Sequence, residues 1–264
     1  MDPMTSLSDG FPGDGIAVVT GAGGGLGRAL AVELVGRGVP VAGIARRPEN
    51  LEETAALIPG GGFTGHIADV ANSDSVRAAF EAIAAGGQRT AILINNAAVY
   101  PRCDFLTEGV PWLMQTVDIN LGGMVNCSYY ALQQMTATGA GRIINVTTFA
   151  DLGPLPGSSA YSVSKGAGKV FTRALVADLH DRFPDIVVSD WIPGELATQM
   201  GTPGGIPPEV FAKWGADQAL WHDRSLTGTL FDRNIEFLPP VSLKGRLKNL
   251  LLLKKRPKPR MVGG

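Results

Sequence analysis

The chain has 264 residues, of which 45% are hydrophobic and 18% are charged, with two cysteines and a formal net charge of −1. This composition excludes a disordered chain and a disulfide-stapled scaffold, and it favours a globular protein whose cysteines stay reduced in the cytoplasm. No apolar run reaches the roughly 18 residues that a membrane-spanning helix needs, and residues 1–14 form a polar lead, rich in Gly and Pro, that we expect to be disordered.

Short apolar runs alternate with longer segments of helical periodicity through most of the chain. The runs predict strands at residues 16–19, 39–44, 63–67, 91–94, 142–146 and 186–191. The segments between them predict helices at residues 26–35, 49–57, 73–85, 110–135 and 160–183. Alternation of this kind builds right-handed crossovers. We therefore predict one α/β domain over residues 15–240, a doubly wound parallel sheet with helices on both faces.

A glycine-rich turn over Thr20–Gly27 follows the first predicted strand and opens the first helix, with the spacing Thr-Gly-x-x-x-Gly-x-Gly. Glycines allow a tight turn and a close approach to a pyrophosphate, and the helix N-terminus supplies free N–H groups and the positive end of the helix dipole. Such turns also join strands to helices where no ligand binds, so this motif alone leaves dinucleotide binding open.

Tyr161 and Lys165 lie four residues apart in the helix predicted at residues 160–183, which places them on one face. A neighbouring ammonium stabilises a phenolate and lowers the pKa of the phenol from its ordinary value near 10, so such a pair can move protons. The same spacing is common between solvent-exposed side chains, and the pair alone does not establish an active site.

In this order, the two motifs together resemble the short-chain dehydrogenase/reductase family, over about residues 15–198. The resemblance implies a Rossmann fold, NAD or NADP as cofactor, and hydride transfer between the nicotinamide and a small-molecule carbonyl or secondary alcohol. No metal is expected, because the three histidines of the chain follow no ligand spacing. The residues that would line the cofactor phosphates are Gly21, Gly25, Leu26 and Gly27.

The end of the second predicted strand bears on the choice between NAD and NADP. An acid about 20 residues after the glycines binds the ribose 2′-hydroxyl of NAD, whereas an arginine pairs with the 2′-phosphate of NADP. Here Ala45 is followed by Arg46 and Arg47, with no acid at the position. We therefore expect NADP in preference to NAD, the alternative being that both arginines are only solvated.

Further residues match the family's cofactor contacts one by one. Asp69 and Val70 follow the third predicted strand and match a contact to adenine. Asn96 and Ala97 match a motif that supports the sheet and abuts the cofactor, with Ala98 in the place of its final Gly. After the strand at 186–191, the residues implied to hold the nicotinamide end are Pro193, Gly194, Leu196 and Thr198.

The family has a catalytic serine thirteen residues before the tyrosine, and in this chain Thr148 occupies that position. Threonine keeps a hydroxyl for the substrate carbonyl, while its methyl group narrows the pocket and stiffens χ1. Asn120 matches the asparagine that supports a water-linked proton relay to the lysine, and a polar residue there could otherwise cap or kink the helix. The implied catalytic residues are therefore Asn120, Thr148, Tyr161 and Lys165, of which Tyr161 and Lys165 also contact the cofactor.

Three segments are expected to rim the substrate at the carboxyl ends of the strands, at residues 98–105, 149–159 and 195–226, the last as a lid. Their large side chains are mostly aromatic or aliphatic, which favours a mostly apolar substrate. The same side chains could instead pack the lid onto the body. They are Tyr100, Phe149, Leu152, Leu155, Met200, Phe211, Trp214 and Trp221.

Residues 241–264 form a basic, leucine-rich tail. Residues 243–264 contain eight Lys and Arg and no acid, which leaves 15 basic against 24 acidic residues in the rest of the chain, a net charge of −9. Such a tail can bind an anionic membrane surface peripherally, or it can dock on the acidic body or on a second subunit. In the family, a final strand forms part of a tetramer interface. This chain follows the sequence pattern of that strand only as far as Phe231. We therefore expect a homodimer through the helices at 110–135 and 160–183, and we leave a tetramer open.

The leading interpretation is an NADP-dependent carbonyl reductase or alcohol dehydrogenase. Two alternatives stay open: a non-catalytic dinucleotide-binding sensor or scaffold, and a lyase or isomerase on the same fold. The presence of both Tyr161 and Lys165 favours catalysis over the first alternative. We expect no nucleic-acid partner.

Overall fold

The computed structural model describes residues 15–198, 200–201, 204–238 and 258–263. Its centre is an eight-stranded sheet of order β3-β2-β1-β4-β5-β6-β7-β8, parallel except for the antiparallel β7–β8 pair. The strands are β1 (Gly15–Thr20), β2 (Val41–Ala45), β3 (Phe63–Ile67), β4 (Arg89–Asn95), β5 (Ala140–Val146), β6 (Asp185–Ile192), β7 (Leu230–Asp232) and β8 (Ile235–Glu236).

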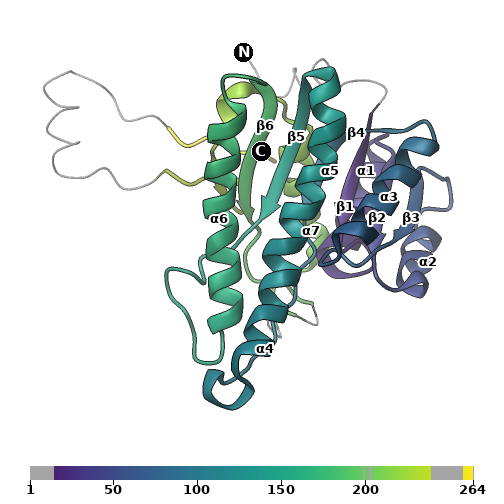
Figure 1. Ribbon diagram of the computed structural model, residues 1–264. Helices are drawn as coiled ribbons and strands as arrows, with labels where there is room; N and C mark the ends of the chain where they lie inside the picture. Colours follow the sequence, from purple (N-terminus) through teal and green to yellow (C-terminus); the bar gives the residue numbers. More distant parts are fainter. Residues whose placement is uncertain (1–14, 199, 202–203, 239–257, 264) are drawn as a thin grey trace, which may run out of the picture.

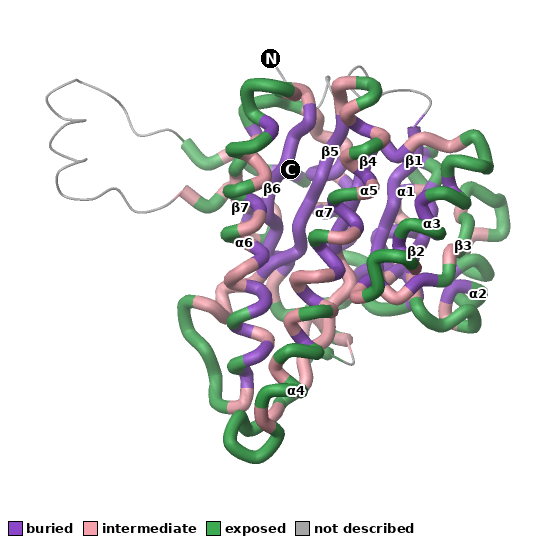
Figure 2. The backbone as a smooth tube through the Cα atoms, in the orientation of Figure 1, coloured by how far each residue is buried: buried purple, intermediate pink, exposed green. Residues whose placement is uncertain are grey.

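Helices cover both faces of this sheet (Figure 1). On one face, α1 and α7 bury their apolar side chains against the strands, and on the other α3, α5 and the end of α6 do so. The central strands β1, β2, β4, β5 and β6 form the buried centre (Figure 2), because they lie between two helical layers. The predicted doubly wound α/β fold is confirmed. The helices are α1 (Gly25–Gly36), α2 (Pro48–Ala56), α3 (Ser73–Ala85), α4 (Phe105–Val117), α5 (Gly123–Thr138), α6 (Ser159–Leu179) and α7 (Pro208–Leu220).

The long helix predicted at 110–135 begins earlier and is interrupted twice. The Asp104 carboxylate accepts hydrogen bonds from the N–H groups of Leu106 and Thr107, so the helix starts at Phe105. A left-handed Gly109, with φ of 69°, kinks α4, two residues before Pro111, which disfavours helical backbone ahead of it. A π-helical turn, η2 (Asp118–Gly122), then joins α4 to α5. Turns of this kind occur frequently at functional sites.

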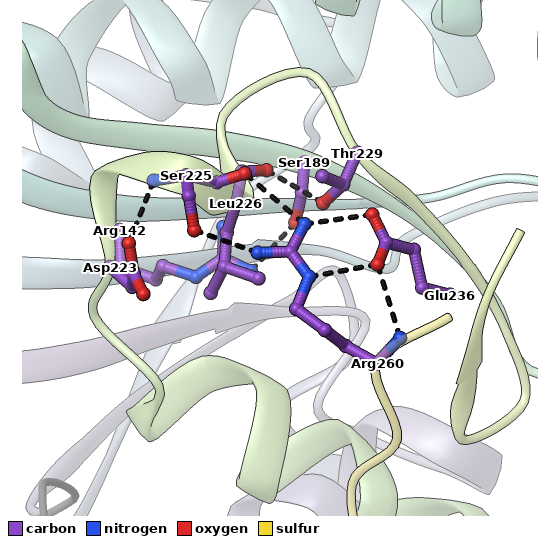
Figure 3. Close-up of polar contacts among 8 residues, drawn as sticks. All are labelled: Arg142, Ser189, Asp223, Ser225, Leu226, Thr229, Glu236 and Arg260. Carbon is purple, nitrogen blue, oxygen red and sulfur yellow. Dashed lines mark hydrogen bonds and ion pairs between the residues drawn. The ribbon is translucent and has the colours of Figure 1, made fainter. Parts of the chain in front are cut away.

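The described end of the basic tail packs against the sheet. The Arg260 guanidinium donates to both carboxylate oxygens of Glu236, at 2.8 and 2.7 Å, and to the Ser225 hydroxyl at 2.8 Å (Figure 3). This contact holds the pKa of the Glu236 carboxyl below its ordinary value. Val262 is buried, and its N–H donates to the Asn234 carbonyl. Residues 258–263 therefore belong to the folded body.

The basic, leucine-rich stretch at 243–257 lies outside the described residues. The choice between a membrane contact and docking on protein therefore stays a prediction. Across the part of the chain that the structure describes, no helix is long and apolar enough to cross a bilayer.

Candidate active site

At Gly21 and Gly27 the glycine-rich turn is packed so closely that no side chain would fit. Gly21 and Gly25 have φ of 70° and 51°, a conformation that favours glycine. A Cβ on Gly27 would collide with the carbonyl oxygen of Gly21 and would lie 2.7 Å from the Nδ2 of Asn96. The first turn of α1 therefore sits directly on the end of β1, and Gly24, Gly25 and Leu26 line the adjoining cleft.

Asn96 ties this turn to the end of β4. Its Nδ2 donates to the Thr20 carbonyl at 2.9 Å, and its N–H donates to the Thr20 hydroxyl at 2.9 Å. The N–H of Ala97 donates to the same hydroxyl at 2.9 Å. The structure thus brings the predicted Asn96 and Ala97 against the glycine turn, and the neighbouring strand ends form one rigid floor.

A cavity of about 330 Å³ extends from the turn to the ends of β2 and β3. Its wall includes the four residues predicted for the adenosine half of a dinucleotide, Arg46, Arg47, Asp69 and Val70. One carboxylate oxygen of Asp69 accepts the N–H of Ala71 at 3.0 Å, which fixes the direction of that side chain.

A cleft of about 920 Å³ opens at the carboxyl ends of the central strands. It is lined by the glycine turn and by the segment after β6, which includes Pro193, Gly194, Leu196 and Thr198. The Thr198 methyl group lies 3.3 Å from the position that a Cβ on Gly25 would take. The predicted phosphate and nicotinamide contacts therefore meet across one cleft, and Thr148, Tyr161 and Lys165 share it.

Tyr161 is hydrogen-bonded to Thr148, and its ring centroid lies 4.2 Å from that of Tyr100. Burial raises the pKa of the Tyr161 phenol, and the bond to Thr148 offsets only part of this rise. The sequence predicts the opposite direction, a pKa lowered by Lys165. The difference arises because the phenol is desolvated and the lysine ammonium is turned to another partner.

Lys165 is 3% exposed, and its Nζ donates to the Val146 carbonyl at 2.8 Å. Burial lowers the pKa of this amine to about 8, although the Asp190 carboxylate acts in the opposite direction. An amine with a pKa of about 8 is still mostly protonated at neutral pH, but it loses its proton more readily than the ordinary ammonium that the sequence suggests. Its charge state changes close to physiological pH.

A series of buried polar side chains, linked by hydrogen bonds, lies near Lys165, and the sequence alone does not reveal it. The Asp190 carboxylate accepts the Thr172 hydroxyl at 2.6 Å, and Thr172 accepts the Nδ2 of Asn145 at 2.8 Å. Burial raises the pKa of Asp190 to about 7, against the pull of the hydrogen bond from Thr172 and of three nearby cations. No spacing rule points to Asp190, which is a single acid near the end of a mostly apolar strand.

The Asn120 side chain joins two segments of the site. Its Oδ1 accepts the N–H of Val99 at 2.8 Å, and its Nδ2 donates to the Val99 carbonyl and the Ser164 hydroxyl, both at 3.0 Å. These bonds hold the chain after β4 to α6 beside Tyr161. These bonds engage both polar atoms of the Asn120 side chain, and none of them reaches Lys165. A proton relay from Asn120 to Lys165 therefore stays a prediction.

The residues predicted to rim the substrate divide into three groups. Phe149 and Met200 line the main cleft, and Tyr100 and Met200 line a neighbouring cavity of about 430 Å³. Leu152 and Leu155 are exposed. The aromatic residues of α7 and its end pack on the body instead: Phe211 belongs to the hydrophobic core, and Trp214 and Trp221 pack against it.

Within the described residues, no group of His, Cys, Asp and Glu side chains could hold a metal ion. Asp232 and Arg233, at the β7–β8 turn, also line the main cleft. Sequence reasoning missed both, because their place in the cleft depends on a short strand pair with no strong local signal.

The comparisons with known proteins agree with this geometry. Residues 15–205 match the family model described as short chain dehydrogenase. The chain is 35% identical over 189 residues to the short-chain reductase protein NovJ of Streptomyces niveus, which covers 71% of each chain. It is 30% identical over 188 residues to a 3-oxoacyl-[acyl-carrier-protein] reductase of a Synechocystis strain, covering 70% of this chain and 75% of that one.

A solved structure from Agrobacterium tumefaciens, provisionally named a gluconate dehydrogenase, superposes with a TM-score of 0.77. It covers 83% of this chain and 94% of the other at 22% identity, and at that identity the likeness supports the fold alone.

Proposed function

Because this chain belongs to the short-chain dehydrogenase family, it is an NAD(P)-dependent oxidoreductase, and we propose that it uses NADP to interconvert a carbonyl and a secondary alcohol on a mostly apolar substrate. The observation that carries the proposal is one cleft that joins the glycine turn to Thr148, Tyr161 and Lys165. The close packing of Gly21, Gly27 and Asn96 fits a dinucleotide phosphate, because it leaves backbone rather than side chains at the cleft floor.

When bound, the reduced cofactor supplies the hydride. The proposed roles of the protein groups follow from their placement. The Thr148 hydroxyl orients the carbonyl oxygen, and Tyr161 donates its phenolic proton to the alkoxide that develops there. Because burial raises the pKa of Tyr161, the phenol keeps this proton at neutral pH, which suits reduction. Lys165 is proposed to hold the nicotinamide ribose beside the phenol.

The proposal is tested with a panel of apolar ketones and secondary alcohols, run in parallel with NADPH, NADH and their oxidised forms. Consumption of NADPH with formation of the alcohol supports it. A sensor or scaffold would bind NADPH without turnover. A lyase or isomerase would convert its substrate with no net change in the cofactor.

At position 148, Thr148→Ser is expected to keep kcat/KM within a few-fold, whereas Thr148→Val lowers it about 10- to 100-fold. Valine keeps the branched shape but removes the hydroxyl that bonds Tyr161 and is proposed to bond the carbonyl. Steady-state rates with one ketone measure both variants. Equal rates for the threonine and valine enzymes would show that the hydroxyl does not touch the reacting oxygen.

The proposed preference for NADP rests on Arg46, which lines the adenosine cavity beside Arg47. Replacing Arg46 by Ala is expected to weaken NADPH binding by about 1.5–3 kcal/mol, roughly 10- to 100-fold, through loss of a charge-assisted contact to the 2′-phosphate. NADH binding should change little. Fluorescence titration measures both dissociation constants, with Arg77→Ala, on the outer surface of α3, as the control. Wild-type protein that binds NADH as tightly as NADPH would contradict the assignment.

The assembly, lid and location are proposed on separate observations. The outward faces of α4, α5 and α6, side by side in Figure 1, expose apolar side chains that a homodimer would cover. They include Phe105, Val110, Tyr129, Val163 and Val170. Light scattering on the purified protein separates monomer, dimer and tetramer. Of the predicted lid at residues 195–226, only the part before α7 is proposed to cover the substrate, because α7 packs on the core. The two unpaired cysteines support a reducing, cytoplasmic location.

A further inference from the structure

Among the described residues, Arg233 is the one non-glycine residue with a left-handed backbone, at φ of 56°. A side chain disfavours this conformation, which persists only where the surroundings impose it. Three hydrogen bonds impose it here. The Arg233 N–H donates to the Ile192 carbonyl at 2.7 Å, and its own carbonyl accepts the indole N–H of Trp191 at 2.9 Å and the Nε2 of Gln218 at 3.0 Å. The β7–β8 turn is thus tied to the buried core.

This backbone directs the Arg233 side chain to the wall of the main cleft. Its Nε lies 3.4 Å from the position that a Cβ on Gly194 would take. Gly194 has φ of 109°, and its missing side chain leaves room for the arginine. Arg233 therefore shares the cleft with Tyr161 and Lys165.

The Arg233 guanidinium makes no hydrogen bond or ion pair with any described residue. Arg233 shares this lack of a described partner with Arg46 and Arg47, which line the adenosine cavity. Other arginines of the chain do have such partners, among them Arg28, Arg37, Arg77, Arg142, Arg224 and Arg260. Two carboxylates, Asp232 and Glu195, line the same cleft, and neither pairs with Arg233. An anion in this cleft would therefore be held by direct contact with the guanidinium rather than by a broadly positive field.

The position of β7 in the sheet indicates whether such an anion would belong to the cofactor or to the substrate. Four strand spacings separate β7 from β1 in the order β1-β4-β5-β6-β7, or about 19 Å at roughly 4.8 Å each. The glycine turn that follows β1 is therefore remote from Arg233. Two spacings, about 10 Å, separate β7 from β5, which Thr148 follows. Arg233 thus lies on the substrate side of the cleft.

Part of the wall on that side is aromatic. Phe149, next to Thr148, packs on Phe237 after β8, with 5.3 Å between ring centroids. A substrate that reaches from Thr148 to Arg233 would therefore pass an aromatic surface before it meets a cation.

We propose that Arg233 binds a carboxylate of the substrate, and that the preferred substrates are oxo acids whose carbonyl and carboxylate are separated by an apolar spacer. A guanidinium binds a carboxylate strongly because it offers two parallel N–H donors. This inference rests on the proposed function and narrows its substrate class from mostly apolar carbonyl compounds to those that carry a distal acid.

The test compares 7-oxooctanoate with 7-oxooctanamide, which share the carbonyl and the spacer and differ in charge. Full-length wild type should prefer the acid with NADPH. In Arg233→Asn, the acid-to-amide ratio of kcat/KM should fall about 10- to 100-fold, as for a lost charge-assisted hydrogen bond. Asparagine tolerates the left-handed backbone. Arg233→Lys should retain part of the preference, and Arg182→Asn, on the surface after α6, is the matched control.

Two further measurements separate the possible results. The dissociation constant of NADPH should be the same in wild type and Arg233→Asn, and a weaker value would assign Arg233 to the cofactor instead. Calorimetric binding of 7-oxooctanoate to the NADP⁺ complex tests the contact without turnover, so a failure of the proposed chemistry does not obscure it. Equal acid-to-amide ratios, or equal binding of acid and amide, in wild type and Arg233→Asn would overturn the inference. Thermal melting of each variant establishes that it is folded.

Discussion

Replacing Tyr161 by Phe is expected to lower kcat for ketone reduction about 100-fold or more, while the dissociation constant of NADPH changes little. The phenol is the proposed proton donor, and phenylalanine keeps its shape without the hydroxyl. Only the acid–base step loses a partner, because the ring contact with Tyr100 survives the change. Stopped-flow measurement of a single turnover, together with fluorescence titration of NADPH, checks both halves of this expectation.

The matched control is Tyr129→Phe, a tyrosine exposed on α5. It should leave kcat and the NADPH dissociation constant unchanged. A Tyr161→Phe enzyme that keeps most of its activity would rule out the phenol as the proton donor and leave Thr148 or solvent in that role.

Replacing Lys165 by Ala is expected to damage both binding and rate. We expect NADPH to bind about 10- to 100-fold more weakly, because a charged donor to the cofactor is lost. We also expect kcat to fall on the order of 100-fold, because the nicotinamide ribose loses the residue proposed to hold it beside the phenol. The side chain is 3% exposed, so circular dichroism and thermal melting must accompany the kinetics. Lys213→Ala, exposed on α7, is the control.

The pH dependence tests Lys165 more specifically. Burial lowers the pKa of its amine to about 8, so the ammonium is present below that pH and lost above it. NADPH binding by wild type should therefore weaken as the pH rises through about 8, and Lys165→Ala should show no such step. An identical pH profile in both proteins would contradict a role for the ammonium in holding the cofactor.

The elements of the sheet and the cofactor turn were predictable because their signals are local. Apolar runs such as Ile92–Ile94 indicate buried strands wherever they occur in the fold. In the glycine-rich turn, Gly21 and Gly27 are required because a side chain at either position would collide with the turn itself or with the residues that follow β4. The pairing of Tyr161 with Lys165 follows from helix periodicity alone. The structure and the comparisons confirmed the fold class and the family that these features predict.

Helix boundaries were predicted less well, because caps and kinks depend on single side chains. Asp104 extends α4 toward the N-terminus, and the π turn around Asn120 has no periodic signature. The aromatic residues of α7 were ambiguous for another reason. Apolar composition gives the same pattern for a substrate lid and for a core helix, and only the packing of Phe211 and Trp214 distinguishes them.

The sequence by itself determined the doubly wound sheet and the place of the glycine-rich turn, because each depends on local spacing, and the family resemblance supplied the residues expected at the strand ends. Only the tertiary structure decided their electrostatics. The raised pKa of Tyr161, the lowered pKa of Lys165 and the buried Asp190 all follow from desolvation, which depends on how completely distant segments cover a group. The same holds for Arg233, whose direction is set by hydrogen bonds to Trp191 and Gln218 that no local pattern encodes.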